Sequence, residues 1–116
     1  MAHFEVTTSV EPDRVVVALA GECDFAGRDE LTSVLLAAVN SATVVFVDLA
    51  ELRFLDSSGV HALIAGHHAA LDRGGRLYVV KAAGVVTRVL ELTGVDELLR
   101  PPVDVGLRSD AERRHG

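Results

Sequence analysis

Cysteine is almost absent from this chain, and long apolar runs are missing altogether. The single cysteine, Cys23, cannot form an internal disulfide, and no cysteine cluster of the kind that binds zinc is present. No apolar run reaches the length of a bilayer span, and the start, MAHFEVTTSV, lacks the layout of a secretory signal. These absences predict a cytoplasmic protein that does not enter a membrane.

Basic charge is also scarce. Eleven lysines and arginines stand against seventeen acidic residues, which gives a net charge of −6, and the basic residues form no stripe. A chain of this sign is repelled by phosphate backbones and by anionic lipid. We therefore expect no direct contact with nucleic acid or with a membrane surface.

Hydrophobic residues, in contrast, are plentiful. They make up 49% of the 116 residues, which is enough for a single folded domain with a proper core. We expect that domain to occupy residues 1–103, and residues 104–116 to form a polar tail that is frayed or weakly helical.

The apolar residues change between the spacing of strands and the spacing of helices. A short continuous apolar run is typical of a buried strand, and apolar residues at three- and four-residue steps are typical of a helix. The pattern predicts strands at 3–10, 14–20, 43–49 and 76–80, helices at 26–40, 58–72 and 85–92, a loop at 50–56 and a last short edge strand at 98–103.

This order of elements predicts an α/β fold. Strands that alternate with helices favour a small, mixed, mostly parallel β-sheet covered by helices, with the first strand antiparallel in a hairpin. If strands 14–20 and 43–49 run parallel, the loops at 21–25 and 54–59 face each other. They then share the edge of the sheet at which sites are usually built.

The second of these loops contains the tetrapeptide DSSG (56–59), immediately before a predicted helix. Asp and Ser are favoured helix caps, so capping alone would explain the pattern, although a cap needs only one such residue. A serine hydrolase would need a glycine two positions before its nucleophile, and this chain has none there. The nearest histidine, His61, belongs to the same helix. We therefore expect no enzymatic activity.

Phosphorylation is the third interpretation of the tetrapeptide. The amides and the dipole at a helix start stabilise a phosphate by about 0.3–1 kcal/mol, so a phosphate on Ser57 would not unfold the domain. A partner covering that surface would have to desolvate the added charge beside Asp56. A loss of about 4 kcal/mol moves a micromolar contact towards the millimolar range. Ser57 is thus a candidate switch.

Three segments resemble the signature segments of the STAS domain, and among its subgroups the bacterial anti-sigma-factor antagonists are the most similar. The segments are GECD (21–24), VDLAELRFLDSSGV (47–60) and VTRVLELTGV (86–95). The resemblance covers roughly residues 4–103, with the segments in the same order and at the same spacing as in the family.

The resemblance implies a partner switch without catalysis or a cofactor. The unphosphorylated antagonist binds an anti-sigma factor that is also a serine kinase, which frees the sigma factor; a separate serine phosphatase reverses the modification. The acceptor would be Ser57, and Asp24 matches the family's acidic position in the facing loop. The implied partner-binding residues are Glu22, Asp24, Phe25, Asp56, Ser58, Gly59 and His61, with Gly59 keeping the helix start open to a close approach.

Several features depart from this picture or leave it open. Cys23 occupies a position where the family usually has Leu or Ile, and Gly84 one where it usually has proline. The sequence of the C-terminal tail does not favour a helix. His61 and His68 share a helix face, but their spacing does not favour a metal site.

We expect a monomer or a weak homodimer. The alternative function is a STAS scaffold subunit of a larger signalling or transport assembly that is never phosphorylated.

Overall fold

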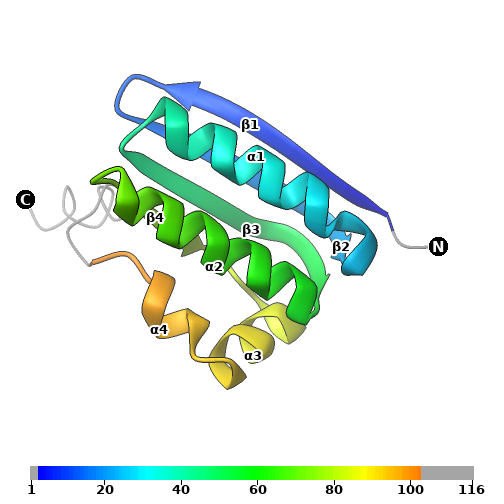
Figure 1. The fold of residues 1–116 in the computed structure, drawn as a ribbon. Coiled ribbons are helices and arrows are strands. Elements are labelled where there is room, and N and C mark those ends of the chain that lie inside the picture. Colours follow the sequence, from blue (N-terminus) through cyan, green and yellow to red (C-terminus); the bar gives the residue numbers. More distant parts are fainter. Residues whose placement is uncertain (1–2, 103–116) are drawn as a thin grey trace, which may run out of the picture.

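A β-hairpin begins the chain in the computed structural model, which describes residues 3–102 (Figure 1). Strands β1 (Phe4–Glu11) and β2 (Arg14–Cys23) pair antiparallel on either side of the two-residue turn Pro12-Asp13. The tail predicted at 104–116 lies outside the described residues.

The other two strands complete a mixed sheet. Strands β3 (Val44–Leu55) and β4 (Arg76–Val80) are parallel to β2, and the spatial order is β1-β2-β3-β4. The predicted α/β fold, with a mostly parallel sheet and an antiparallel first strand, is confirmed.

Helices α1 (Arg28–Ser41) and α2 (Ser57–Asp72) lie side by side over one face of the sheet (Figure 1). A short 3₁₀ turn, η1 (Phe25–Gly27), precedes α1. Buried side chains of α3 (Gly84–Leu92) and α4 (Val95–Leu99) join the same core. This single core holds together the elements that carry the predicted site.

Side chains of the central strand β3 alternate between the two faces of the sheet. Val45 and Val47 belong to the core beneath the helices. Phe46, between them, points to the opposite face, where it is buried with the guanidinium of Arg14 5.1 Å from its ring centroid and the ring of Tyr78 at 5.7 Å. Both faces of β3 are therefore apolar, which explains the continuous hydrophobic run of its sequence.

The predicted loop at 50–56 is wrong for all but its last residue, because β3 continues to Leu55. Its pairing with β2 shifts register between Ala18 and Ala20 and again between Gly21 and Glu22. These irregularities break the two-residue alternation, so that Leu52 and Leu55, three apart, are both buried. The sequence pattern of a regular strand could not show this extension.

The predicted edge strand at 98–103 is also wrong. Gly94 adopts a left-handed conformation with φ of 80°, and α4 follows it directly. Val95 and Leu99, four residues apart, then share one helix face and are both buried. Burial of this pair favours a helical turn over an extended segment, and Arg100–Pro102 form no strand.

Within residues 3–102, no helix combines the length and the apolar character required to cross a membrane.

Candidate functional site

The ends of β2 and β3 bring the two predicted loops together. Cys23 pairs with Leu55 at the last position of the parallel ladder. The backbone N–H of Asp56 then donates to the carbonyl oxygen of Cys23 at 3.1 Å. The expected meeting of segments 21–25 and 54–59 is confirmed, but 21–23 belong to β2 and 54–55 to β3, so much of the contact is strand pairing and not contact between loops.

Asp56, and neither serine, is the N-cap of α2. Its Oδ1 accepts hydrogen bonds from the backbone N–H groups of Ser58 at 2.9 Å and Gly59 at 3.3 Å. Ser57 is the first residue of the helix, and its side chain is exposed, whereas Ser58 is half-buried. Capping therefore does not require the hydroxyl of Ser57, and Ser57 itself is exposed.

Asp24 has a local structural role on the facing loop. It is half-buried, and its Oδ1 accepts from the backbone N–H of Ala26 at 3.0 Å, which starts the 3₁₀ turn η1. Each loop thus begins its helical segment with an aspartate. Two carboxylates, those of Asp24 and Asp56, therefore lie at this edge of the sheet.

Gly59 serves the interior of the protein rather than an open surface. A Cβ at this position would lie 2.2 Å from Cδ1 of Leu55 and 3.0 Å from Sγ of Cys23. The residue is buried, so the expected free approach of a partner to Gly59 does not match the structure. The close approach is made by the protein's own core.

Two exposed phenylalanines flank the loops. The side chain of Phe25 is 70% exposed and that of Phe54 is 40% exposed. The guanidinium of Arg28 lies 5.2 Å from the ring centroid of Phe25. Phe54 falls within the predicted loop at 54–59, but neither Phe54 nor Arg28 is among the individual residues that the sequence predicts to bind a partner. For Phe54, the available signal is a large apolar residue next to DSSG.

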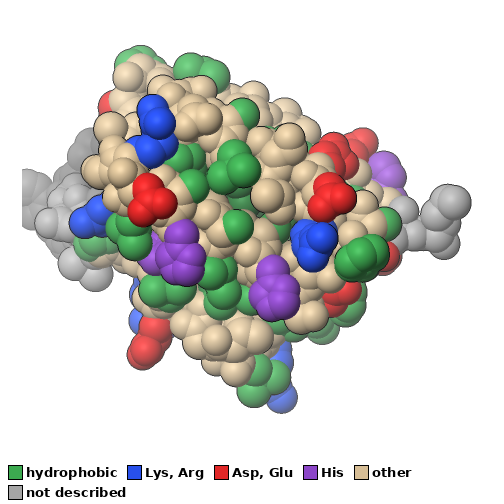
Figure 2. Space-filling view, viewed as in Figure 1, with side chains coloured by type: hydrophobic (Ala, Val, Ile, Leu, Met, Phe, Trp, Pro, Cys, Tyr) green, Lys and Arg blue, Asp and Glu red, His purple; other side chains and the backbone are tan. Residues whose placement is uncertain are grey.

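Two further predicted residues, Glu22 and His61, lie near these loops. Glu22, half-buried, has a carboxylate oxygen 3.9 Å from Nη2 of Arg53. His61 is exposed and lines a shallow hollow between α1 and α2 together with Arg28, Thr32 and Ala65. Figure 2 shows this helix face, with charged and histidine side chains around apolar patches. We call the surface formed by Glu22, Asp24, Phe25, Phe54, Ser57 and His61 the rim.

Cys23 lies beneath the rim and is not a nucleophile at neutral pH. Its side chain is fully buried, and this burial, with the nearby carboxylates of Asp56 and Asp24, raises the pKa of the thiol to about 12. A thiol with this pKa stays protonated and unreactive.

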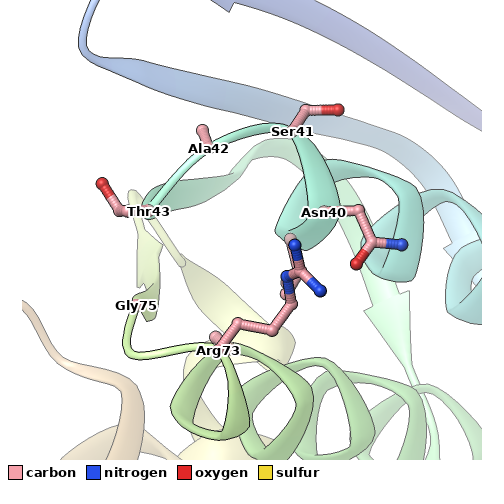
Figure 3. Close-up of a pocket in the computed structure, with 8 residues that line it drawn as sticks. Asn40, Ser41, Ala42, Thr43, Arg73 and Gly75 are labelled. Atoms are coloured by element: carbon pink, nitrogen blue, oxygen red, sulfur yellow. The ribbon is translucent and has the colours of Figure 1, made fainter.

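The hollow at the other end of the helices is not part of this site. It measures about 220 Å³ and lies where α1 and α2 end, with the side chain of Arg73 extending towards Asn40 (Figure 3). Arg73 is the C-cap of α2, at the opposite end of the helix from Ser57. No group of three metal-ligating side chains occurs within the part of the chain that the structure describes.

Comparison with known proteins decides the family. The family model described as "Mlab, STAS domain" matches residues 6–101, which is most of the chain. The chain belongs to the STAS-domain family. Its sequence resemblance to that family is thereby confirmed.

Solved STAS structures share this fold over nearly the whole chain. An anti-sigma factor antagonist from Mycobacterium paratuberculosis is 25% identical, with a TM-score of 0.77 and coverage of 92% of this chain and 93% of the other. The unphosphorylated anti-sigma factor antagonist SpoIIAA is 21% identical, with a TM-score of 0.73 and coverage of 96% of both chains. The phosphorylated form of SpoIIAA from Bacillus is 20% identical, with a TM-score of 0.65, and is matched over 98% of this chain and 100% of the other.

Proposed function

We propose that this STAS domain is an anti-sigma-factor antagonist that phosphorylation at Ser57 switches off. The observation that carries the proposal is the exposure of Ser57 at the first position of α2, while Asp56 alone supplies the cap. The antagonist from Mycobacterium paratuberculosis, 25% identical over nearly the full chain, supports the same function. SpoIIAA, which has the same fold, exists in unphosphorylated and phosphorylated forms.

In the unphosphorylated state, the partner would bind over the rim. Phe25 and Phe54 supply exposed apolar area there, and full burial of such a side chain contributes about 1.5–3 kcal/mol. The proposed partner is an anti-sigma factor with serine kinase activity, and the nucleotide would belong to that kinase. This chain would itself catalyse nothing, and it would act in the cytoplasm.

In the phosphorylated state, the rim would repel that partner. A phosphate on Ser57 adds close to two negative charges beside Asp56, with Asp24 on the adjoining loop. The cap of α2 stays intact, because both of its hydrogen bonds are made by Asp56. The partner, however, would have to desolvate the dianion, which costs several kcal/mol. A serine phosphatase would restore binding.

The test compares two adjacent serines. Ser57→Asp and Ser57→Ala are measured against Ser58→Asp and Ser58→Ala for binding to the cognate anti-sigma factor by calorimetry. We expect Ser57→Asp to weaken binding by about a hundredfold or more and Ser57→Ala to bind like the wild type. Incubation with the kinase and ATP should add about 80 Da, the mass of one phosphate, at Ser57 and not in Ser57→Ala. Tight binding by Ser57→Asp would refute the switch.

A scaffold subunit of a larger assembly, never phosphorylated, is the second candidate. A separate exposed apolar surface on α3 and α4 favours it, since Val85, Leu92 and Leu98 are 57%, 79% and 49% exposed. In that case, Leu92→Ser would abolish assembly, while Ser57→Asp would leave it unchanged. The antagonist function predicts the reverse order of effects.

A further inference from the structure

Strand β1 is an edge of the sheet, and no other strand within residues 3–102 pairs with its outer side. It pairs with β2 in an unbroken register from Phe4 opposite Gly21 to Glu11 opposite Arg14, and it is the outermost strand in Figure 1. Its middle, Val6–Val10, contains no charge and no proline. Bulges, edge prolines and central charges are the usual devices that prevent an edge strand from pairing with another chain, and β1 has none of them.

The backbone groups that face outward can be identified from one hydrogen bond. The N–H of Glu22 donates to the carbonyl oxygen of His3 at 2.7 Å, so His3 faces β2. In an antiparallel ladder, successive residues face alternate sides. The outward N–H and C=O groups of β1 therefore belong to the even-numbered residues, Phe4, Val6, Thr8 and Val10.

We propose that the β1 edge pairs antiparallel with the β1 edge of a second copy, with the two-fold axis at Thr7. In this register Phe4 lies opposite Val10 of the second copy, and Val6 lies opposite Thr8. Each outward-facing residue of one copy then lies opposite an outward-facing residue of the other. Their backbone N–H and C=O groups can form eight hydrogen bonds between the two copies. A shift by one residue would set outward groups against inward ones and is excluded.

Two neighbouring registers are also allowed by the hydrogen bonding. The one with the axis at Val6 pairs only three outward residues of β1, Phe4, Val6 and Thr8, instead of four, and charge disfavours the other. With the axis at Thr8, Glu5 of each copy would lie directly opposite Glu11 of the other, and like charges in that position are destabilising. With the axis at Thr7, Glu11 lies opposite His3, and Glu5 lies opposite Ser9. No like charges face each other.

The side chains also fit this register. Val10 is 78% exposed in the single chain, although it points to the side of the sheet that carries the helices. Pairing places it beside Phe4 of the second copy on that side. The dimer covers an apolar residue that the single domain leaves in water.

The interface is independent of the proposed switch. Ser57 begins α2 after the end of β3, and β2 separates β3 from the β1 edge. Ser57→Asp should therefore leave dimerisation unchanged, so the two proposals fail separately.

Cysteine cross-linking in the full chain tests the register. In Thr7→Cys the two cysteines face each other as a non-hydrogen-bonded pair, with Cα atoms about 4.5 Å apart, within the range of a disulfide. Thr8→Cys places them on a diagonal at about 7–8 Å. The matched control Val10→Cys is exposed but separates them by about 20 Å. The native Cys23 is buried and does not compete.

We expect Thr7→Cys to form a covalent dimer at least ten times faster than either other variant. Equal rates for Thr7→Cys and Val10→Cys would overturn the dimer. Faster cross-linking of Thr8→Cys would overturn the register.

Sedimentation equilibrium tests the hydrogen bonds. Thr8→Pro removes an outward N–H that β2 does not use, so the hairpin remains while two symmetry-related bonds of the dimer are lost. The dimer dissociation constant should rise about thirtyfold. Thr8→Val keeps the N–H and should dimerise like the wild type. A dissociation constant unchanged by Thr8→Pro contradicts the proposal.

Discussion

Replacing Gly59 by alanine tests whether the site is supported from inside. The new Cβ would lie 2.2 Å from Cδ1 of Leu55, where an ordinary contact is 3.4–4 Å. Cγ of the fully buried Leu55 would lie at 3.2 Å and Sγ of Cys23 at 3.0 Å, so the Leu55 side chain would have to shift to make room. Overpacking of this kind costs about 1–3 kcal/mol, whereas alanine gains about 1 kcal/mol over glycine in helix propensity. The expected net loss of unfolding free energy is about 1 kcal/mol.

A double-mutant cycle separates these two contributions. In a Leu55→Ala background the clashing methyl group is absent, so Gly59→Ala should stabilise the protein by up to about 1 kcal/mol. The coupling between the two positions is then about 2 kcal/mol. Ala65→Gly, at an exposed position of the same helix, should lower the free energy of unfolding by about 1 kcal/mol in both backgrounds. This variant measures the difference in helix propensity between alanine and glycine without a change in packing.

Urea unfolding followed by circular dichroism measures all of these free energies. The comparison requires equal m-values, so that differences in midpoint report stability alone. If Gly59→Ala changes stability by the same amount with and without Leu55, the close packing beneath the loop is not what requires glycine, and the reasoning fails.

Four further predictions concern three single residues. Asp56→Ala should lower the free energy of unfolding by about 0.5–2 kcal/mol, measured in urea, since it removes the acceptor of both cap bonds; a change near zero would contradict the assigned cap. Cys23, whose thiol pKa rises from 9.0 to about 12, should stay unreactive towards Ellman's reagent until unfolding. The unfolded thiol ionises at a lower pH than the folded one, so the free energy of unfolding should fall as the pH rises above about 9. Cys23→Ala should remove the part of this pH dependence that the thiol contributes. An equal pH dependence in the variant and the wild type would argue against this assignment. Phe46→Ala should cost about 3–5 kcal/mol by calorimetry, and a cost below 1 would show that the contacts with Arg14 and Tyr78 do not confine the ring.

Local sequence signals predicted the regular elements well where one face or both faces are apolar in a regular pattern. Strand β4 has the predicted bounds, 76–80, and α2 begins one residue before the predicted start. β2 and β3, in contrast, run beyond their predicted ends, and η1 occupies part of the predicted helix 26–40. Pairing with a neighbouring strand extends β2 and β3, and no periodicity within one segment records such pairing.

In the candidate site, too, some features follow from the sequence and others only from tertiary contacts. The sequence by itself determined the chemistry at the helix start: an aspartate, two serines and a glycine, on an acidic chain with a single cysteine. Only the tertiary structure decided their roles, because Cys23 and Leu55 are far apart in the chain and meet only through the parallel ladder. That meeting buries Gly59 against the core, while the exposed Phe25 comes from the facing loop. Composition and spacing fix which groups exist, but contacts between distant segments decide which of them are buried and which face a partner.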